Sequence, residues 1–321
     1  MEMGDIYKDI NVDIDNQIKN LVDKLNYYTK LYDEGKPQIS DKEWDDLYFE
    51  LVALENKYKI YYEDSPTQRV NYQVVNKLNK IEHSHPMLSL DKTKDVNVIK
   101  SFIGNKDYIV MAKMDGLTCS LTYENGKLIK AETRGNGLIG EDILHNALQV
   151  KNIPNKIKYK NRLVVDGEII CTYKDFEPFA NEYKNPRNFA SGSIRLLDSK
   201  ESSSRNLTFV AWDLIEGGFK ENKLMDKLRF LQELNFDVVP SFSDSDNNRI
   251  ENFIEDIKRT TQAYGYPIDG IVIKYNSCDE YEAAGRTDHH YRGRIGFQVL
   301  RWRSWVRIIR HRMEYAEEVV S

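Results

Sequence analysis

Residues 108–134, YIVMAKMDGLTCSLTYENGKLIKAETR, constrain the fold of this chain more than any other stretch. The stretch opens with an apolar run that ends at Ala112, and it continues as two alternating runs on either side of Asn125-Gly126. An Asn-Gly pair between alternating runs is the strongest short-range signal for a β-hairpin. The sequence therefore predicts a strand followed by a hairpin, with Lys113 where the first strand ends.

Lys113 is a candidate nucleophile because of this position. An amine near its usual pKa of about 10.4 is almost wholly protonated at neutral pH, so it needs desolvation or a cationic neighbour before it can attack. The buried end of a strand would supply the desolvation. The alternative is a lysine that protects a strand edge from aggregation, and the short KMDG motif leaves both interpretations open.

The order of the later segments favours the nucleophile. Glu168 lies in VVDGEII, a further apolar strand is predicted at 209–214, and IDGIVIK ends at Lys274. Lysine, glutamate and lysine on separate strands resemble the covalent nucleotidyltransferases, which include DNA ligases and capping enzymes. Over about residues 15–298 the chain resembles the NAD-dependent bacterial DNA ligases in particular, through DSPTQRV (64–70), HPMLSLD (85–91), TRGNGLIGEDIL (133–144) and NPRNFASGSIRLLD (185–198).

This resemblance implies the chemistry of the site. Lys113 would attack the adenylyl phosphorus of NAD, nicotinamide mononucleotide (NMN) would leave, and magnesium would serve as the metal cofactor. Arg134 and Lys274 would neutralise phosphate charge, because a guanidinium can hold a phosphate bidentately. Glu168 would contact the ribose, and Asp115 completes the lysine motif.

Further positions of the adenosine pocket follow from the same resemblance. Ser89 and Leu90 match residues that line the pocket, although an ordered linker would explain them equally well. Met111 stands where the family usually carries a glutamate that contacts adenine. Gln298, in IGFQV, stands where a second phosphate-binding lysine is expected.

Two helices are predicted ahead of this region. Apolar residues at helical spacing predict a helix over 12–33, which Gly35 and Pro37 end. Ser40 and Glu43 form a capping box that begins the second helix. These helices make up a small helical hairpin.

The first turn of the second helix carries Asp41, Trp44 and Asp45 on one face. Acids at a helix N-terminus also favour the helix dipole, which is the alternative explanation for them. In the NAD-dependent ligases such a hairpin binds the NMN half of NAD, and these three residues match its motif, with Trp44 where tyrosine is usual. Tyr28 is assigned to the accompanying tyrosine pair, and Tyr32 is its alternative.

The rest of the chain alternates strands and helices. Strands are expected at 162–171, 207–215 and 268–276. One helix is expected to begin near 141, and a second to follow the first strand and end at about 183. Further helices are expected at 187–198, 222–235 and 249–264. The fold class is α+β, with antiparallel sheets flanked by helices. Residues 1–65 form the helical NMN-binding subdomain, 66–298 the nucleotidyltransferase domain, and 299–321 an atypical basic tail.

Composition narrows the class of protein. A length of 321 residues corresponds to one or two domains. Of these residues 40% are hydrophobic, which is enough for a substantial core, and 30% are charged. No apolar run reaches the length of a membrane span and no signal peptide is present, so we expect a cytoplasmic monomer. Cys119, Cys171 and Cys278 lie far apart, which excludes a zinc ribbon and a disulfide framework.

The expected partner is nicked double-stranded DNA. A net charge of −5 does not itself indicate a nucleic-acid partner, so binding would depend on a local basic face. The candidates for that face are basic residues on loops: Lys184, Arg187, Arg195, Lys200 and Arg205.

Departures from the family pattern predict slow self-adenylation and weak sealing. Residues 286–321 hold eight arginines and no lysine, and no oligonucleotide-binding barrel, zinc finger or helix-hairpin-helix array follows the nucleotidyltransferase region. One rival is an ATP-dependent polynucleotide ligase, against which the helical hairpin argues. The other is a non-catalytic nucleotide- or DNA-binding relative, which Gln298 makes conceivable.

Overall fold

The computed structural model describes residues 3–33, 38–62, 64–67, 78–87, 90–217, 222–286 and 291–298. Ser89 and the tail at 299–321 lie outside the described residues, as do the side chains of Tyr32, Asp41 and Asp45. Among the described residues, every helix is too short or too polar to span a lipid bilayer.

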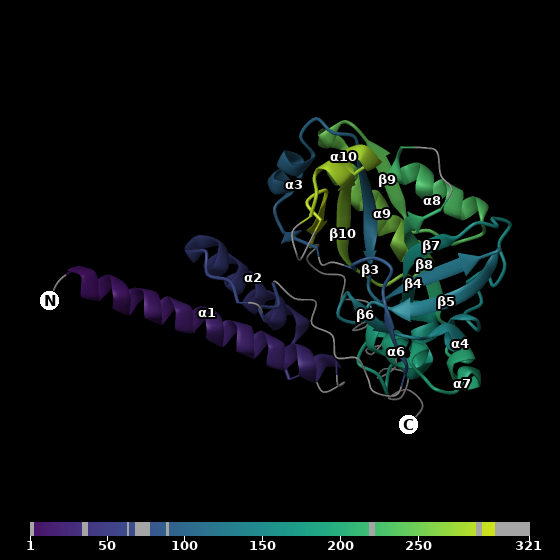
Figure 1. Cartoon of the computed structure of the whole chain (residues 1–321), viewed down its shortest axis with the longest axis horizontal. Helices are drawn as coiled ribbons and strands as arrows, with labels where there is room; N and C mark the ends of the chain where they lie inside the picture. Colours follow the sequence, from purple (N-terminus) through teal and green to yellow (C-terminus); the bar gives the residue numbers. More distant parts are fainter. Residues whose placement is uncertain are drawn as a thin grey trace, which may run out of the picture.

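The predicted helical hairpin is confirmed. Helix α1 (Met3–Asp33) begins earlier than expected, and α2 (Asp41–Tyr58) lies beside it (Figure 1). Ser40 Oγ accepts from the backbone N–H of Glu43 at 3.2 Å, and Glu43 Oε2 accepts from the backbone N–H of Ser40 at 2.8 Å. The two helices share a small core of their own, formed by Ile18, Leu21, Val22, Leu25 and Leu51.

The predicted β-hairpin is confirmed as β4 (Leu117–Glu124) and β5 (Lys127–Thr133). Asn125 and Gly126 have φ of 51° and 74°, the positive values that a two-residue type I′ turn requires. The end of the preceding strand was predicted wrongly, because β3 (Tyr108–Met114) continues past Ala112. Its ladder with the neighbouring strand extends to Met114, so Lys113 lies inside the strand.

Two sheets form the body of the molecule. The four-stranded sheet has the order β5-β4-β7-β8, and the five-stranded sheet has the order β2-β11-β10-β3-β9. The predicted antiparallel arrangement is confirmed except where β11 runs parallel to β2. Besides β3, β4 and β5, the strands of these sheets are β2 (Lys92–Thr93), β7 (Leu163–Ile170), β8 (Thr208–Glu216), β9 (Ser241–Asp244), β10 (Ile268–Tyr275) and β11 (Arg294–Phe297).

A small ribbon and several helices complete the fold. β1 (Lys80–Glu82) pairs with β6 (Ile139–Glu141). The helices predicted at 222–235 and 249–264 are confirmed as α8 (Leu224–Glu233) and α9 (Ile250–Tyr264). Two helices were not predicted, α3 (Val96–Ile103) and α10 (Cys278–Ala283).

Three predicted helices are shorter than expected. The segment up to about 183 forms only α5 (Tyr173–Phe176) and a 3₁₀ turn. The helix predicted at 187–198 is α6 (Pro186–Ile194), which ends earlier, and the separate α7 (Ser199–Ser203) follows the predicted range. No helix starts at Glu141, because this residue ends β6 and its N–H donates to Thr133 Oγ1 at 3.1 Å. Only the four-residue α4 (Leu144–Ala147) follows it.

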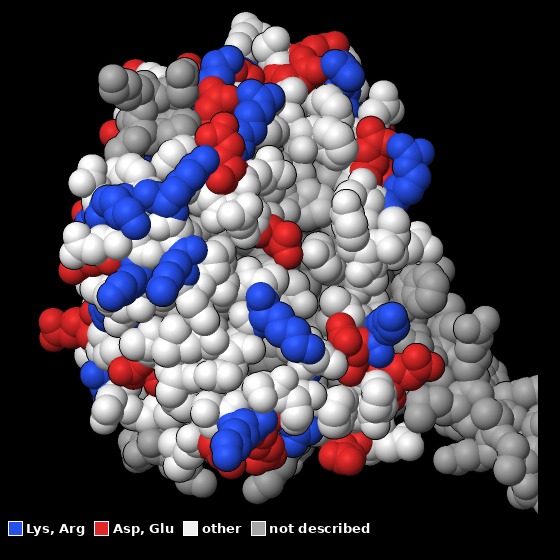
Figure 2. Space-filling view, turned by 90° about the vertical axis from the view of Figure 1, so that its right-hand side faces the viewer, with Lys and Arg blue, Asp and Glu red and all other residues white. Residues whose placement is uncertain are grey.

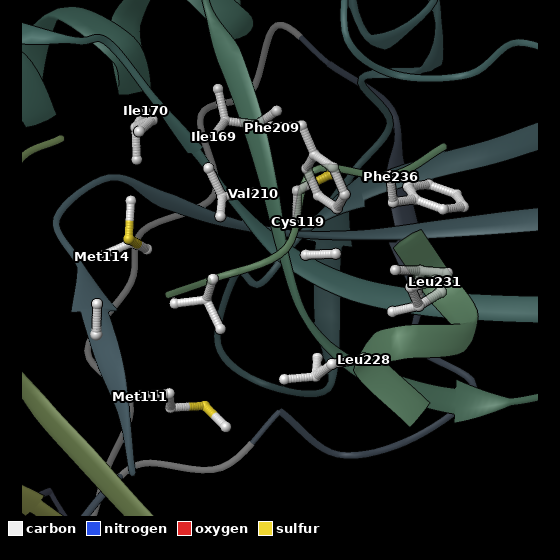
Figure 3. Close-up of a cluster of buried hydrophobic side chains, with 14 of the residues drawn as sticks. Met111, Met114, Cys119, Ile169, Ile170, Phe209, Val210, Leu228, Leu231 and Phe236 are labelled. Carbon is white, nitrogen blue, oxygen red and sulfur yellow. The ribbon is translucent and has the colours of Figure 1, made fainter. Parts of the chain in front are cut away.

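The main core lies between the two sheets. Figure 3 shows methionines of β3 facing side chains of β4, β7, β8 and α8. Burying one such apolar side chain stabilises the fold by about 1.5–3 kcal/mol. The labelled core residues are Met111, Met114, Cys119, Ile169, Ile170, Phe209, Val210, Leu228, Leu231 and Phe236.

Candidate active site

Lys113 forms an ion pair with Asp269, between β3 and the start of β10. The lysine Nζ donates to Asp269 Oδ2, and the two side chains are 26% and 32% exposed. Burial alone would raise the pKa of Asp269, but the positive charge of Lys113 and then of Lys92 holds it below its usual value. The amine is therefore fixed at a half-buried position that solvent and a ligand can still reach.

Asp269 is the site residue that sequence reasoning missed. A signal was present, because Asp269-Gly270 repeats the acid–glycine pattern of the KMDG motif at the start of the strand that carries Lys274. The register between β3 and β10 shifts between Ile268 and Gly270, at this acid, and such irregularities are often found next to active sites.

Glu168 faces the same site from β7. Thr118 on β4 pairs with it and donates from Oγ1 to Glu168 Oε2 at 3.1 Å. Burial raises the pKa of this carboxyl to about 7, against the opposing influence of Arg187 and Lys113. The structure thus brings Glu168 within electrostatic range of Lys113, and the carboxyl titrates near neutral pH.

Arg134 follows β5 and points into the interior. Burial lowers the pKa of its guanidinium to about 10, and the charge of Arg294 adds to this effect. The group still carries its charge at neutral pH. Its Nε donates to the backbone carbonyl of Met87 at 2.9 Å, and its backbone N–H donates to the carbonyl of Thr118 at 3.0 Å.

The three arginines among the basic loop residues have different surroundings. Arg187 Nη1 lies 3.3 Å from Asp115 Oδ1, so this arginine belongs to the candidate site. Arg195 pairs with the buried Glu141 at 2.9 Å, and Arg205 packs over aromatic rings of the main core. These last two stabilise the fold instead of presenting charge to a partner.

Lys184 and Lys200 are exposed. Figure 2 shows one face of the molecule, on which basic and acidic side chains are interspersed instead of forming a broad basic surface. For these two lysines the predicted DNA face remains a prediction.

Lys274 lies deep in the protein, at 2% exposure. Its Nζ contacts Asp213 Oδ2 of β8 at 2.8 Å and lies 5.2 Å from the ring centroid of Trp212. Burial lowers the pKa of this lysine, although the adjacent Asp213 opposes that shift. Burial would raise the pKa of Asp213, yet Lys274 holds it below its usual value.

Met111 and Gln298 take different positions around Lys113. Met111 is 3% exposed and lies opposite Val272 on β10, so it forms part of the floor between the sheets. Gln298 follows β11, and its N–H donates to the carbonyl of Thr93 at 2.9 Å. Its Cα lies 3.7 Å from the point that a β-carbon on Gly270 would occupy, and Gly270 pairs with Lys113.

The helical hairpin carries the remaining candidates. Trp44 Nε1 donates to Thr29 Oγ1 at 3.1 Å, and its ring stacks on Tyr48 with centroids 5.3 Å apart. Tyr28 is half-buried beside Tyr27, with ring centroids 5.7 Å apart. Leu90 packs against the edge of the main core.

The hairpin also contacts the segment around β2. Lys92 Nζ lies 5.5 Å from the centroid of Tyr48, and Lys94 Nζ lies 4.3 Å from that of Phe49. Because Lys92 also lowers the pKa of Asp269, it links the face of α2 with the surroundings of Lys113.

Comparisons with known proteins follow the same division of the chain. The family model of the NAD-dependent DNA ligase adenylation domain matches residues 75–299, and that of the DNA ligase-like N-terminal NAD⁺-binding domain matches 11–71. The DNA ligase of Lachnoclostridium phytofermentans is 39% identical over 303 residues, which cover 91% of this chain and 46% of the relative. That of Ruminiclostridium cellulolyticum is 36% identical over 300 residues, which cover 90% and 45%.

The chain thus spans about half the length of the curated relatives it matches. A solved structure of a Lig E DNA ligase matches 66% of this chain and 68% of its own, with 17% sequence identity and a TM-score of 0.37.

Proposed function

We propose, since the chain belongs to the NAD-dependent DNA ligase family, that Lys113 attacks NAD and carries the adenylyl group for the sealing of nicked DNA. The observation that supports this most is the ion pair of Lys113 and Asp269, within electrostatic range of Glu168 and Arg187. It combines a nucleophile, an acceptor for its proton and a cation for phosphate in one half-buried site.

The proposed step is a displacement at phosphorus. The Nζ lone pair of Lys113 forms a phosphorus–nitrogen bond to the adenylyl group, and the phosphorus–oxygen bond to the phosphate of NMN breaks. NMN leaves with the electron pair of that bond. Asp269, which already accepts from the amine, takes the proton and passes it to solvent.

Catalysis of this type is mostly positioning and neutralisation of charge. Arg134 and Lys274 supply fixed positive charge along the nucleotide, which costs no reorganisation during the reaction. Glu168, once ionised, accepts a hydrogen bond from a ribose hydroxyl. Asp115 orients Arg187 toward the phosphates of NAD.

The adenosine half of NAD is proposed to bind above β3. Met111 would support the base, with Ser89 and Leu90 at the side of the pocket, and Gln298 would donate a hydrogen bond to phosphate. A glutamine offers this bond without a charge.

The NMN half of NAD is assigned to the helical hairpin. Asp41, Trp44 and Asp45 would hold it, with Tyr28 completing the aromatic contact. The stacking of Trp44 on Tyr48 supports this, because it fixes the indole at the end of the hairpin. On this proposal residues 1–65 bind NMN, 66–298 transfer the adenylyl group, and 299–321 are an appended basic tail.

We propose magnesium as the metal cofactor. Among the described ranges no three His, Cys, Asp or Glu side chains gather in a way that could hold a metal ion. A site with so few protein ligands fits magnesium, because magnesium usually keeps several waters and binds through substrate phosphates with few carboxylates. The ion would then be bound mainly by the phosphates of NAD.

The proposed polymer substrate is nicked double-stranded DNA in the cytoplasm. We propose that the chain acts as a monomer. Lys184 and Lys200 are the candidates for contacts to the phosphate backbone, and such contacts position DNA without reading its sequence.

A weak or inactive relative is the second candidate function. The observation that favours it is Gln298, which lies beside Gly270 and so close to Lys113, where the family expects a charged group. This candidate would bind NAD without forming the adenylate.

Intact mass spectrometry after incubation with NAD and magnesium, and separately with ATP, tests both candidates. The proposal predicts a single adenylyl adduct with NAD, none with ATP, and none in Lys113→Ala. Lys130→Ala is the matched control, because Lys130 is also a strand lysine paired with an acid, Glu132, at 2.5 Å. An adduct mapped to Lys130 or Lys274 would contradict the assignment.

A further inference from the structure

Residues 83–87, here called the strap, cross the four-stranded sheet on the face that carries Glu168. The strap is hydrogen-bonded through its backbone to the glycine-rich turn after β5. His83 N–H donates to the carbonyl of Leu138 at 2.9 Å, and Met87 N–H donates to that of Gly137 at 3.1 Å. These bonds fasten only one side of the strap.

Two histidines fasten the strap to the sheet itself. His83 lies 3.1 Å from Glu132 of β5, with both side chains almost fully buried, and its Nε2 lies 2.8 Å from the carbonyl oxygen of Arg134. His85 Nε2 lies 2.8 Å from Asp166 Oδ2 of β7. The strap therefore bridges from β5 to β7.

These acids belong to one row across the sheet. Glu132, Ser120, Asp166 and Asp213 are direct partners in the register of β5, β4, β7 and β8. A buried row of carboxylates is stable only if cations balance it. The described basic groups that face the row are the imidazole of His83 and Lys130 at Glu132, His85 at Asp166, and Lys274 at Asp213, with Arg294 and Lys227 adding to the charge near Asp213.

Among the described residues Asp166 contacts one basic side chain, His85, whereas Glu132 contacts two, and Lys227 and Arg294 add charge to Lys274 at Asp213. The side chain of Asp166 is 3% exposed, and within the described part of the chain its Oδ1 has no hydrogen-bond partner. Burial tends to lower the pKa of His85, but the hydrogen bond to Asp166 and the charges of Glu132 and Asp213 leave it raised. The imidazole therefore holds its proton to higher pH than an ordinary histidine.

The strap also reaches the groups that hold the nucleotide in the proposed function. The carbonyl of Met87 accepts from Arg134 Nε at 2.9 Å. Asp166 precedes Glu168 by two residues on β7, so both side chains lie on one face of the sheet. Movement of the strap would displace Arg134 directly and would leave a buried negative charge beside Glu168.

We propose that His85 is a positioning residue for adenylation: its pair with Asp166 fastens the strap, and the strap holds Arg134 in place for the NAD phosphate. This proposal rests on the proposed function. It predicts that the affinity for NAD falls at alkaline pH. Because the pKa of His85 is raised in the folded protein, the ion pair is complete below about pH 6.5 and is lost as pH rises through that raised value.

The neutral form of His85 keeps part of the contact. With Ser84 Oγ 3.2 Å from Nδ1, the neutral ring can still donate from Nε2 to Asp166, but no charge then balances the carboxylate. The strap is therefore weakened at alkaline pH without being released, and the expected loss of affinity is graded.

The test uses the full chain with Lys113→Ala, so that NAD binding is measured without covalent reaction. Calorimetric titration with NAD between pH 6 and 9 should show affinity that first rises as Glu168 ionises near pH 7 and then declines on the alkaline side as His85 loses its proton. Adding His85→Gln should weaken binding about tenfold at pH 6.5, the effect of losing one charged hydrogen bond, and should remove the alkaline decline. Adding both His85→Gln and Asp166→Asn should restore most of the affinity, because two amides can pair without charge, and should leave it independent of pH on that side.

His145→Gln is the matched control. His145 is also half-buried, but its Nε2 lies 3.0 Å from a backbone carbonyl, that of Leu196, and not from a carboxylate. This variant should keep both the affinity and the alkaline decline of the parent.

The rate of amide hydrogen exchange in the peptide that contains the strap is a measurement that needs no ligand. His85→Gln should exchange faster than the parent at pH 6.5, and the double variant should recover. If the strap exchanges faster but NAD affinity and its pH profile match the parent, His85 is structural only and the proposal is overturned. Unchanged exchange together with unchanged affinity would overturn it as well.

Failure of the proposed function looks different. In that case the unaltered chain would form no adenylate and the Lys113→Ala parent would bind no NAD at any pH, and both proposals would fall together. Adenylate formation by the unaltered chain, with a normal pH profile in His85→Gln, would overturn the role of His85 alone.

Discussion

Lys113 and Lys274 lie on one face of the ladder formed by β3 and β10, near its two ends. Lys113 pairs with Gly270 and Lys274 pairs with Ile109, so four residues separate the two lysines along the strands. At about 3.3 Å per residue this is roughly 13 Å. Met111 lies between them on the same face, which leaves one amine at each end of an apolar floor.

The buried pair at the far end of this ladder makes a prediction about stability. Lys274→Met leaves Asp213 buried without its cation, and breaking such a pair should lower the free energy of unfolding by about 3–5 kcal/mol. Adding Asp213→Leu should recover most of that loss, but adenylation should stay impaired because the phosphate charge is still missing. Urea unfolding and adenylate yield, measured on the same samples, separate the two effects.

The control for this experiment is an exposed ion pair. Arg259 Nη2 lies 2.6 Å from Asp256, with the arginine side chain 82% exposed, and such pairs contribute little. Arg259→Ala should leave unfolding and adenylation nearly unchanged. An equally small effect of Lys274→Met on unfolding would contradict the importance of the buried pair.

From the raised pKa of Glu168 we expect that increasing pH lowers the stability of the fold but favours the binding of NAD. Its pKa of about 7 lies above the value of an unfolded glutamate, so the folded state binds more protons and stability decreases as pH rises from about 4.5 to 7. Glu168→Gln should remove this slope and stabilise the protein at pH 8 by up to about 3 kcal/mol. The same variant should lose NAD affinity at pH 8, where the ionised carboxylate would accept from the ribose.

A thermal unfolding series over pH 4–8 checks the first part, and NAD titration at pH 8 checks the second. Glu177→Gln, an exposed acid of the 3₁₀ turn, serves as the control. A stability slope that is the same in Glu168→Gln and in the parent would show that another group titrates there.

Asp269 should be required for the attack by Lys113. Asp269→Asn keeps the shape of the side chain but removes its charge and its capacity to take a proton, so adenylation should slow by about 10²- to 10⁴-fold. Asp279→Asn is an exposed control at an acid that interacts with Asn222. Single-turnover rates with saturating NAD measure the step directly, and a rate near that of the parent would mean that solvent takes the proton.

Gln298→Lys should accelerate adenylation. Removing one preorganised donor from a developing anionic centre typically costs about 10²- to 10³-fold, so restoring the charge should recover a comparable factor. Gln298→Met, of similar size, should slow the reaction further. Equal rates in all three proteins would show that this side chain does not reach the phosphates, despite its backbone position near Gly270.

Trp44 should affect the binding of NAD and not the chemical step. Trp44→Ala removes the stacking on Tyr48, worth about 0.5–1.5 kcal/mol, and should raise the KM for NAD by up to about tenfold with little change in kcat. Trp44→Tyr should retain most of the affinity. If adenylation by NAD survives deletion of residues 1–65 undiminished, the hairpin does not bind the NMN half.

Local signals explain what the sequence could predict. The Asn125-Gly126 turn and the Ser40 capping box depend on neighbouring residues, and both are confirmed. Long apolar periodicity predicted α8 and α9 in the same way. The strands that carry Glu168 and Lys274 were also predicted, because their apolar neighbours lie next to them in the sequence.

Contacts between distant segments explain what was missed. The short strands β2, β9 and β11 have too few residues for a periodic pattern. They form by pairing with strands distant in sequence, β9 with β3, β11 with β10, and β2 with β11. The pair of His85 and Asp166 joins residues 81 positions apart, which no local pattern can indicate. Arg195 was interpreted as a surface charge because its partner, Glu141, lies on another element.

Strand β7 carries candidate site residues on one face and buried apolar residues on the other. Asp166 and Glu168 lie on the face that meets the strap and Lys274, while Val165 and Ile169 are buried on the opposite face. Because side chains alternate, a shift of pairing by one residue would exchange the two sets. A single-residue insertion or deletion in this strand would therefore abolish folding and catalysis together, whereas most substitutions in it can be assigned to one or the other.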